Sequence, residues 1–297
     1  MDLLDFGLSA IRSMFSAYTH ESKVKVGLVV SVAQGLDSGA RRPDGKARPT
    51  LAADGGQVKR VPLAGNVEAV MRALARAIDG LELPAVEKIS NNQKEDPFQV
   101  LIATLLSART QDATTLGAST RLFKVARTPR TMAKLTVKQI ERLIYPVSFY
   151  RHKARHVRAT CRMIVERFNG HVPATMEELL MLPGVGRKTA NLVLILAFGS
   201  ERNICVDTHV HRISNRLGWV RTRTPDETEQ ALYRATAARF WPHINLYLVT
   251  WGQNVCRPVF PRCQECVLRP LCPRVGVTRE SRAGAVANSQ VSSLNSQ

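Results

Sequence analysis

The stretch that decides the fold is Leu182-Pro-Gly-Val-Gly-Arg-Lys-Thr-Ala190, followed by the segment Val206-Asp-Thr-His-Val-His211. Gly184 and Gly186 flank one apolar residue and precede an apolar run with helical spacing, so they predict a tight turn that leads directly into a helix. Such a turn presents backbone N–H groups at the positive end of the helix dipole. A phosphate group is therefore the expected ligand of this turn.

Two ionisable residues follow the turn. Lys188 falls in the first turn of the expected helix, where the dipole and Arg187 both disfavour the charged ammonium, so it is a candidate amine nucleophile. Asp207 begins the next helical pattern, and a turn–helix–loop–helix path can bring both side chains to one site. A solvated lysine at a helix start and an N-capping aspartate are the structural alternatives that the residues leave open.

The charge of the chain points to a polyanionic partner. Its 297 residues, 44% of them hydrophobic, include 42 Lys and Arg against 24 Asp and Glu, a net charge of +18. Residues 1–65 carry nine basic and six acidic groups and residues 275–297 carry two and one, so residues 66–274 carry +14. Because the helical part itself is basic, we expect salt-dependent binding to nucleic acid rather than charge that serves solubility alone.

Other features of the sequence exclude several classes of protein. No apolar run approaches the roughly 18 residues of a membrane span, and residues 1–18 lack the basic start of a secretory signal. Cys161 and Cys205 stand alone in apolar helical patterns, whereas the other four cysteines crowd into one short segment. This pattern indicates a reducing compartment and a metal site rather than a disulfide framework.

The spacing of apolar residues predicts an all-α fold. Asp96 and Pro97 resemble the N-cap and first residue of a helix that runs through Val100–Leu106. Strand-like alternation is almost absent. Further helices are expected over 66–79, from near 112, and over 136–144, 149–168, 176–181, 187–198, 207–217, 225–239 and 243–254.

The four clustered cysteines, Cys256, Cys263, Cys266 and Cys272, have the spacing C-x6-C-x2-C-x5-C. Four thiolates within seventeen residues can hold either a zinc ion or a [4Fe–4S] cluster, since each centre accepts four cysteines. Zinc ribbons usually supply two C-x2-C pairs, whereas this segment has one. The residues alone leave both metals open.

Taken together, LPGVGRKTAN, VDTHVHR and the cysteine spacing resemble the endonuclease III family of helix-hairpin-helix DNA glycosylases, over about residues 66–274. The resemblance implies a two-lobed all-α fold with a DNA-binding cleft between the lobes and a C-terminal [4Fe–4S] loop. It implies a helical barrel over 90–200 and a second lobe from 66–89 plus 201–274. We expect residues 1–65 to be a flexible extension and residues 275–297 a disordered tail.

The resemblance also implies an activity. The chain is expected to be a bifunctional DNA glycosylase and apurinic/apyrimidinic lyase of base excision repair that removes oxidised pyrimidines. Lys188 would attack C1′ of a flipped nucleotide to form a Schiff base, Asp207 would accept a proton and stabilise charge on the sugar, and β-elimination would follow. The implied partner is double-stranded DNA with damaged bases or abasic sites, bound by a monomer. The expected location is the cytoplasm and nucleoid of a bacterium or, in another cell, a reducing compartment that contains DNA.

The family resemblance assigns DNA contacts to several further residues. Arg109 and Phe149 occupy the positions that fill the space left by a flipped base, and both depart from the common bacterial glutamine and leucine. His209 matches a histidine that lines the cleft, although a histidine at a helix start is often structural. The remaining expected contacts to DNA are Gly184, Gly186, Arg187, Arg257, Arg262 and Arg269.

Two other functions remain as alternatives. Monofunctional adenine or thymine mismatch glycosylases share much of this pattern but replace the lysine at position 188. The adenine enzymes usually carry a further C-terminal domain, for which the 25 residues after Cys272 leave no room. A non-catalytic DNA-binding module would bind abasic DNA without cutting it.

Overall fold

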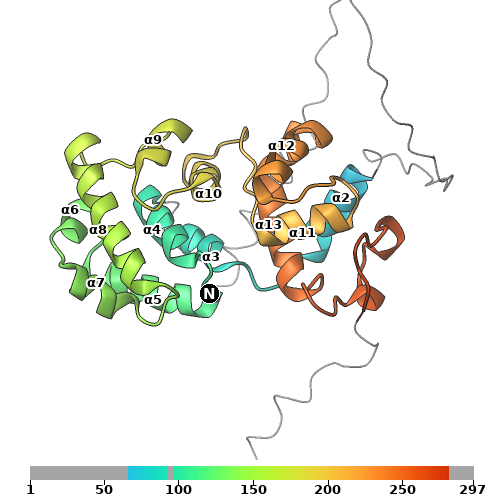
Figure 1. The fold of residues 1–297 in the computed structure, drawn as a ribbon, viewed down its shortest axis with the longest axis horizontal. Helices are drawn as coiled ribbons and strands as arrows, with labels where there is room; N and C mark the ends of the chain where they lie inside the picture. Colours follow the sequence, from blue (N-terminus) through green and yellow to red (C-terminus); the bar gives the residue numbers. More distant parts are fainter. Residues whose placement is uncertain (1–65, 93–95, 281–297) are drawn as a thin grey trace, which may run out of the picture. The chain divides into compact units, whose positions relative to one another are not determined.

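The computed structural model describes residues 66–92 and 96–280, all within the compact unit Val58–Gln297 (Figure 1). Within these ranges the chain is helical and contains no strand, and no helix there has the length and apolar character to cross a membrane. The expected extension over 1–65 and most of the expected tail lie outside the described residues. The helices are α2 (Val67–Ala77), α3 (Ala85–Asn92), α4 (Pro97–Ser107), α5 (Asp112–Val125), α6 (Pro129–Ala133), α7 (Val137–Ile144), α8 (Tyr150–Arg167), α9 (Met176–Met181), α10 (Arg187–Phe198), α11 (Thr208–Arg216), α12 (Pro225–Ala235) and α13 (Trp241–Asn254), with 3-10 turns η1 (Ala238–Phe240), η2 (Cys263–Glu265) and η3 (Arg269–Leu271).

Local capping explains where several helices begin. The Asp96 side chain accepts hydrogen bonds from the N–H groups of Phe98 and Gln99, with Pro97 in the first turn, as the sequence predicts. Thr136 forms a capping box at the start of α7. These caps satisfy N–H groups that have no partner inside the helix.

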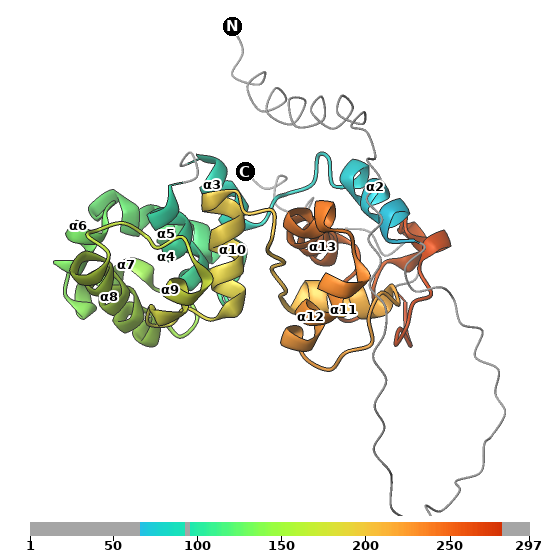
Figure 2. The ribbon, with the colours of Figure 1, turned by 90° about the horizontal axis from the view of Figure 1, so that it is seen from above.

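The first hydrophobic core surrounds α4. Every residue of this helix from Phe98 to Leu106 is buried, and it packs against α3, α5, α8 and α10 (Figure 2). Helices α6 and α7 pack on α8 at the outer side of the same core. A helix that is apolar on all sides requires such enclosure. This core supports both the turn before α5 and the turn before α10.

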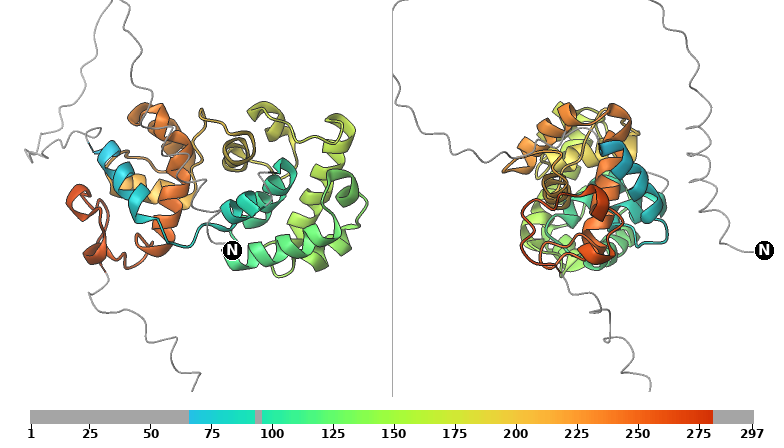
Figure 3. Two further views of the ribbon diagram at one scale, coloured as in Figure 1. Left: turned by 180° about the vertical axis from the view of Figure 1, so that it is seen from behind. Right: turned by 90° about the vertical axis from the view of Figure 1, so that its right-hand side faces the viewer.

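The second hydrophobic core surrounds α13. It is built from α2, α11, α12 and α13 with the connecting residues Trp219 and Leu268, and α13 packs against both α11 and α2 (Figure 3). Segments at opposite ends of the described chain therefore share one core. The cysteine loop that follows α13 lies against it, because Cys256, Cys266 and Cys272 pack on this cluster.

The structure corrects the sequence prediction in two places. Residues 85–89 were expected in the second lobe, but Val86 and Ile89 of α3 belong to the first core, because α3 packs on α4 and α5. The helix expected over 225–239 ends at Ala235, since Thr236 adopts an extended backbone and its hydroxyl donates to the Leu232 carbonyl. Helices α3 and α6 were not predicted.

Asp112 connects elements of the two cores. Its Oδ2 atom accepts hydrogen bonds from the backbone N–H of Ala85 (3.0 Å) and from Nε2 of Gln253 on α13 (3.1 Å). One carboxylate oxygen thus holds the starts of α3 and α5 next to the end of α13. The contact fixes these helices relative to each other directly after the turn that carries Arg109, because α5 begins at Asp112.

Candidate functional site

The turn before α10 has the tight geometry that the sequence predicts. Val185 N–H donates to the Leu182 carbonyl (3.1 Å), and Gly184 has a φ of 81°, which favours glycine. A Cβ atom at Gly184 would lie 2.6 Å from Nδ1 of His156, so the ring would have to shift to admit a side chain. Thr160 of α8 donates to the Pro183 carbonyl (2.8 Å). Helix α8 therefore supports the turn from behind.

Gly186 is the N-cap of α10 and faces open space. No side chain caps this helix, and a Cβ atom at Gly186 would meet nothing within 4 Å. The first N–H groups of α10 are consequently available to a ligand at the positive end of the helix dipole. This arrangement suits a phosphate group, because the backbone can approach it closely.

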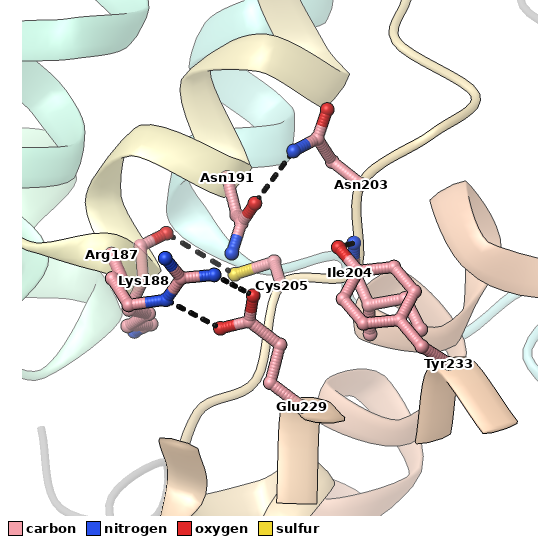
Figure 4. Close-up of polar contacts among 8 residues, drawn as sticks. All are labelled: Arg187, Lys188, Asn191, Asn203, Ile204, Cys205, Glu229 and Tyr233. Carbon is pink, nitrogen blue, oxygen red and sulfur yellow. Dashed lines mark hydrogen bonds and ion pairs between the residues drawn. The ribbon is translucent and has the colours of Figure 1, made fainter. Parts of the chain in front are cut away.

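Lys188 lies in the first turn of α10 and its side chain is exposed. Its ammonium has no hydrogen bond or ion pair with any residue in the described part of the chain. Its backbone carbonyl, by contrast, accepts a hydrogen bond from the buried thiol of Cys205 at 3.5 Å (Figure 4). The main chain at Lys188 is thus fixed while the amine remains free.

Arg187 is held by a residue that the sequence analysis missed. Its guanidinium binds both carboxylate oxygens of Glu229 on α12, at 2.5 and 3.3 Å (Figure 4). The hydrogen bonds to Glu229 raise the pKa of Arg187 further. The Glu229 side chain is 3% exposed, so the carboxylate is the buried partner of this charge-assisted pair. Arg187 therefore joins α10 to α12 and does not act on Lys188 as an unpaired cation; its expected DNA contact stays a prediction.

The connection from α10 to α11 is fixed by side-chain amides. Asn203 donates to Oδ1 of Asn191 on α10 (2.8 Å), as Figure 4 shows, and Asn245 of α13 donates to the Cys205 carbonyl (3.0 Å). Together with the Cys205 thiol on Lys188, these bonds hold the segment that leads to Asp207 against the start of α10. The start of α11 therefore lies near the start of α10 although the two are 21 residues apart.

Asp207 is the N-cap of α11, and its expected chemical role stays a prediction. Its Oδ1 atom accepts the N–H groups of His209 (2.8 Å) and Val210 (2.9 Å). Both bonds use the same oxygen, and Oδ2 has no hydrogen bond to any described residue. The capping role consequently leaves one carboxylate oxygen available for chemistry.

His209 is half-buried, and its pKa responds to burial and to the charged residues around it. Burial lowers its pKa, and the charge of Asp207 opposes this effect, while the charges of Arg212 and Lys188 lower it further. Its Nδ1 atom lies 3.1 Å from Nη2 of Arg212. A Cβ atom at Gly252 would lie 2.5 Å from the same nitrogen, so the ring packs on α13. His209 thus has structural contacts, and its expected DNA contact remains a prediction.

The four clustered cysteines line one cavity of about 30 Å³. Trp251 also lines the cavity, and its buried indole N–H has no hydrogen-bond partner of normal geometry among the described residues. The same N–H is directed at Cys266 and opposes the rise in the pKa of that thiol. Arg216 donates to the Cys256 sulfur (3.3 Å) and to the backbone carbonyls of Arg257 (2.7 Å) and Pro258 (2.9 Å). No three His, Cys, Asp or Glu side chains among the described residues converge closely enough to hold a single metal ion.

The cysteine thiols resist ionisation in each other's presence. Burial raises the pKa of Cys263 to about 11, and Glu280 and the neighbouring cysteines add to this rise. Burial likewise raises the pKa of Cys266 and Cys272. Four thiolates can therefore coexist in this cavity once a positively charged centre balances them.

The remaining residues that were expected to contact DNA differ in their exposure to solvent. Arg257 and Arg269 are exposed, whereas Arg262 is half-buried, so less of Arg262 is available to an external phosphate than the sequence suggested. Arg262 and Arg269 both line the cysteine cavity. Arg109 and Phe149 are both exposed and both have positive φ angles, 55° and 57°. The structure therefore presents these two side chains to solvent on strained turns.

The fold and the hairpin site define the class of protein. Residues 102–237 match the family model of the HhH-GPD superfamily base excision DNA repair protein. The chain is 48% identical to endonuclease III of Thermotoga maritima over 196 residues, which cover 66% of this chain and 92% of that protein. A solved non-covalent endonuclease III–DNA complex matches with a TM-score of 0.62 and 33% identity, covering 70% of this chain and 94% of the other. A trapped covalent endonuclease III–DNA intermediate, an estranged-adenine complex, matches with the same TM-score and identity over 70% and 95%.

The chain therefore belongs to the endonuclease III family, whose members are DNA glycosylase/lyases of base excision repair. The expected all-α helix-hairpin-helix fold is confirmed.

Proposed function

We propose that this chain removes oxidised pyrimidines from double-stranded DNA and cleaves the resulting abasic site by β-elimination. The observation that carries the proposal is the hydrogen bond from the Cys205 thiol to the Lys188 carbonyl (3.5 Å). Since Cys205 lies two residues before Asp207, this bond holds a free amine and a carboxylate with a free oxygen in one neighbourhood. Both charges act on His209, which supports the same proximity.

The proposed chemistry uses these two groups in sequence. The neutral amine of Lys188 forms a bond to C1′ while the bond from C1′ to the base breaks and the base leaves with the bonding electrons. Asp207 accepts the proton that the attacking nitrogen loses and stabilises positive charge on the sugar through its free Oδ2. Sugar-ring opening gives a Schiff base, and loss of a proton from C2′ then expels the 3′ phosphate.

The proposed DNA contacts combine backbone binding with insertion. The uncapped N–H groups at Gly186 bind a phosphate without reading sequence. Arg109 and Phe149 fill the space that the extruded nucleotide leaves. The net charge of +14 over residues 66–274 supports an extended contact with duplex DNA. Endonuclease III in the two similar structures is bound to DNA, once non-covalently and once covalently.

We further propose that Cys256, Cys263, Cys266 and Cys272 hold a [4Fe–4S] cluster. The thiols surround a cavity without converging on one point, which suits a polyatomic centre better than a single ion. The unpartnered Trp251 N–H and the guanidinium of Arg216 are donors suited to its sulfur atoms. The cluster would cross-link a loop that has no core of its own.

The protein would act where DNA and a reducing environment coincide, in the nucleoid of a bacterium or in an equivalent compartment of another cell. The buried free thiols of Cys161 and Cys205 are consistent with such an environment.

The proposal is tested by borohydride trapping on duplexes that carry thymine glycol, dihydrouracil, uracil or mismatched adenine. The wild-type protein should release the oxidised pyrimidines and become covalently joined to the DNA. Lys188→Gln should abolish trapping and strand cleavage while abasic DNA is still bound, and Lys138→Gln, an exposed lysine on α7, should behave as wild type. Base release without trapping would indicate a monofunctional glycosylase, and binding without either reaction a non-catalytic module.

A further inference from the structure

Two exposed turns carry the proposed inserting side chains, and both use the same unfavourable backbone. In the turn after α4, Thr110 N–H donates to the Ser107 carbonyl (2.9 Å), and Arg109 has a φ of 55°. In the turn before α8, Tyr150 N–H donates to the Val147 carbonyl (3.1 Å), and Phe149 has a φ of 57°. Glycine or asparagine is the usual residue at such a position. Something must therefore hold these two larger residues in place.

Lys153, in the first part of α8, makes contacts that hold both turns. Its ammonium donates to the carbonyls of Leu106 (2.7 Å) and Ala108 (2.6 Å) and to Oγ1 of Thr110 (3.0 Å). Its backbone N–H donates to the Phe149 carbonyl (3.0 Å). The Lys153 side chain thus binds the main chain before Arg109 and the Thr110 hydroxyl after it, while the bond to Phe149 is the first backbone bond of α8.

The bonded carbonyls are those that control the two strained residues. The Ala108 carbonyl belongs to the peptide plane that precedes Arg109, so fixing its direction restricts φ of Arg109. The Phe149 carbonyl belongs to the peptide plane that follows Phe149 and restricts its ψ. The two turns are also joined directly, because Ser148 N–H donates to Oγ1 of Thr110 (3.3 Å).

The placement of Lys153 is costly for a residue with a purely packing role. The residue is 9% exposed, and its three acceptors are neutral oxygens. No carboxylate forms an ion pair with it in the described part of the chain. A buried ammonium without a counter-charge is disfavoured by desolvation, as the lowering of its pKa to about 8 indicates. An apolar residue would avoid this cost but would leave the Leu106 and Ala108 carbonyls at the end of α4 without this donor.

We propose that Lys153 is a positioning residue that locks the Arg109 and Phe149 turns into one rigid unit, so that both side chains enter the base stack of duplex DNA together. The inference rests on the proposed role of Arg109 and Phe149 as inserting residues. Lys153 does not touch the reacting atoms. Its contribution is to hold the two side chains in the inserting geometry before DNA binds, so that no ordering of either turn is required at that step.

The test uses three variants. Lys153→Met keeps the length of the side chain but has no hydrogen-bond donors, and Lys153→Arg keeps the charge and the donors. Lys138→Met is the control that removes one positive charge elsewhere. Borohydride trapping rates are measured on an abasic site in duplex DNA and on the same abasic site in single-stranded DNA. Lys153→Met should slow trapping on the duplex roughly ten- to hundredfold, as expected for a misplaced group. It should leave the single-stranded reaction unchanged, because no stack has to be filled there, and Lys153→Arg should restore part of the duplex rate.

A second comparison asks whether Lys153 acts through the two inserting residues. In an Arg109→Ala/Phe149→Ala background, Lys153→Met should cause no further loss on duplex DNA. Thr110→Val removes the cross-turn hydroxyl without changing charge and should weaken duplex trapping in the same direction, which keeps the test decisive if Lys153→Met folds poorly. Thermal unfolding of every variant is measured in parallel.

Three outcomes would overturn the inference. Equal rates for Lys153→Met and Lys138→Met on duplex DNA would mean that the contacts are not used. Equal losses on duplex and single-stranded DNA would indicate a general structural role. A full additional loss in the Arg109→Ala/Phe149→Ala background would place the effect elsewhere. Absence of trapping by the wild-type protein on both substrates would contradict the proposed function instead.

Discussion

Arg187 and Glu229 form a two-point ion pair, with distances of 2.5 and 3.3 Å, between the first turn of α10 and helix α12. The Glu229 side chain is 3% exposed and the Arg187 side chain 43% exposed, so the acid is the buried partner. The pair ties the helix that carries Lys188 to the core that includes α11, the helix that Asp207 caps. The ion pair therefore contributes both to the stability of the fold and to the relative placement of Lys188 and Asp207.

Arg187→Ala should lower the free energy of unfolding by about 2–3 kcal/mol, because it leaves the Glu229 charge buried without its partner. Glu229→Gln, which removes the buried charge, should cost less. The exposed pair Arg162–Glu166 offers a control: Arg162→Ala should change stability by less than about 1 kcal/mol. Urea unfolding measures all three. If Arg187→Ala and Arg162→Ala destabilise equally, the buried ion pair makes no special contribution.

The two glycines of the hairpin should respond differently to substitution. Gly184→Ala should destabilise the fold by roughly 1–3 kcal/mol, because the residue has a positive φ and the new Cβ would clash with the His156 ring. Gly186→Ala should leave the melting temperature nearly unchanged, since the space in front of Gly186 is open.

Gly186→Asp should weaken binding to damaged and undamaged duplex alike, because it adds bulk and negative charge where the phosphate is proposed to lie. Fluorescence anisotropy with both duplexes is the measurement. An effect confined to damaged DNA would mean that the turn contacts the lesion rather than the backbone.

Asp207 should show separable structural and chemical roles. Asp207→Asn keeps the N-cap acceptor, so stability should change little, whereas Asp207→Ala should cost about 1 kcal/mol. Base release should fall steeply in both variants, and cleavage of a ready-made abasic site should fall less, since no bond to a base has to break. Glycosylase and lyase rates measured on matched duplexes check this. Unimpaired base release by Asp207→Asn would exclude the carboxylate from the chemistry.

The cysteine cavity predicts a coloured protein. Anaerobically purified protein should contain four iron atoms and absorb broadly in the visible range, as expected for a [4Fe–4S] cluster. Cys263→Ser should lower the iron content and destabilise the loop after α13, while Cys161→Ser, at a buried cysteine outside the cavity, should keep the iron. Metal analysis that finds stoichiometric zinc and no iron would contradict the cluster.

Lys153 should make stability depend on pH. Burial lowers its pKa from 10.5 to about 8. Between these values the unfolded chain binds more protons than the folded one, so the contribution of Lys153 to the free energy of unfolding rises with pH in that window. Lys153→Met should remove this rise. Denaturant unfolding at several pH values from about 7.5 to 10 makes the comparison, and identical pH profiles would show that Lys153 titrates normally.

The sequence by itself determined the features that depend on neighbouring residues. The turn at Pro183-Gly184 follows from the fixed φ of proline and the freedom of glycine, and the caps at Asp96 and Asp207 follow from a short acceptor before a helical pattern. Most helices could be located because one apolar face repeats every three to four residues. The cysteine spacing indicated the proposed metal loop, since all four candidate ligands lie within a single segment.

Tertiary structure alone decided the contacts between residues far apart in the chain. Glu229 meets Arg187 from 42 residues away, and Lys153 reaches carbonyls 45 and 47 residues before it. Gly184 needs to be a glycine partly because His156 of another helix packs against it. Such partners leave no periodic trace, because the direction of one side chain depends on how whole helices pack. The same reason explains why α3 could not be assigned to its core from the sequence.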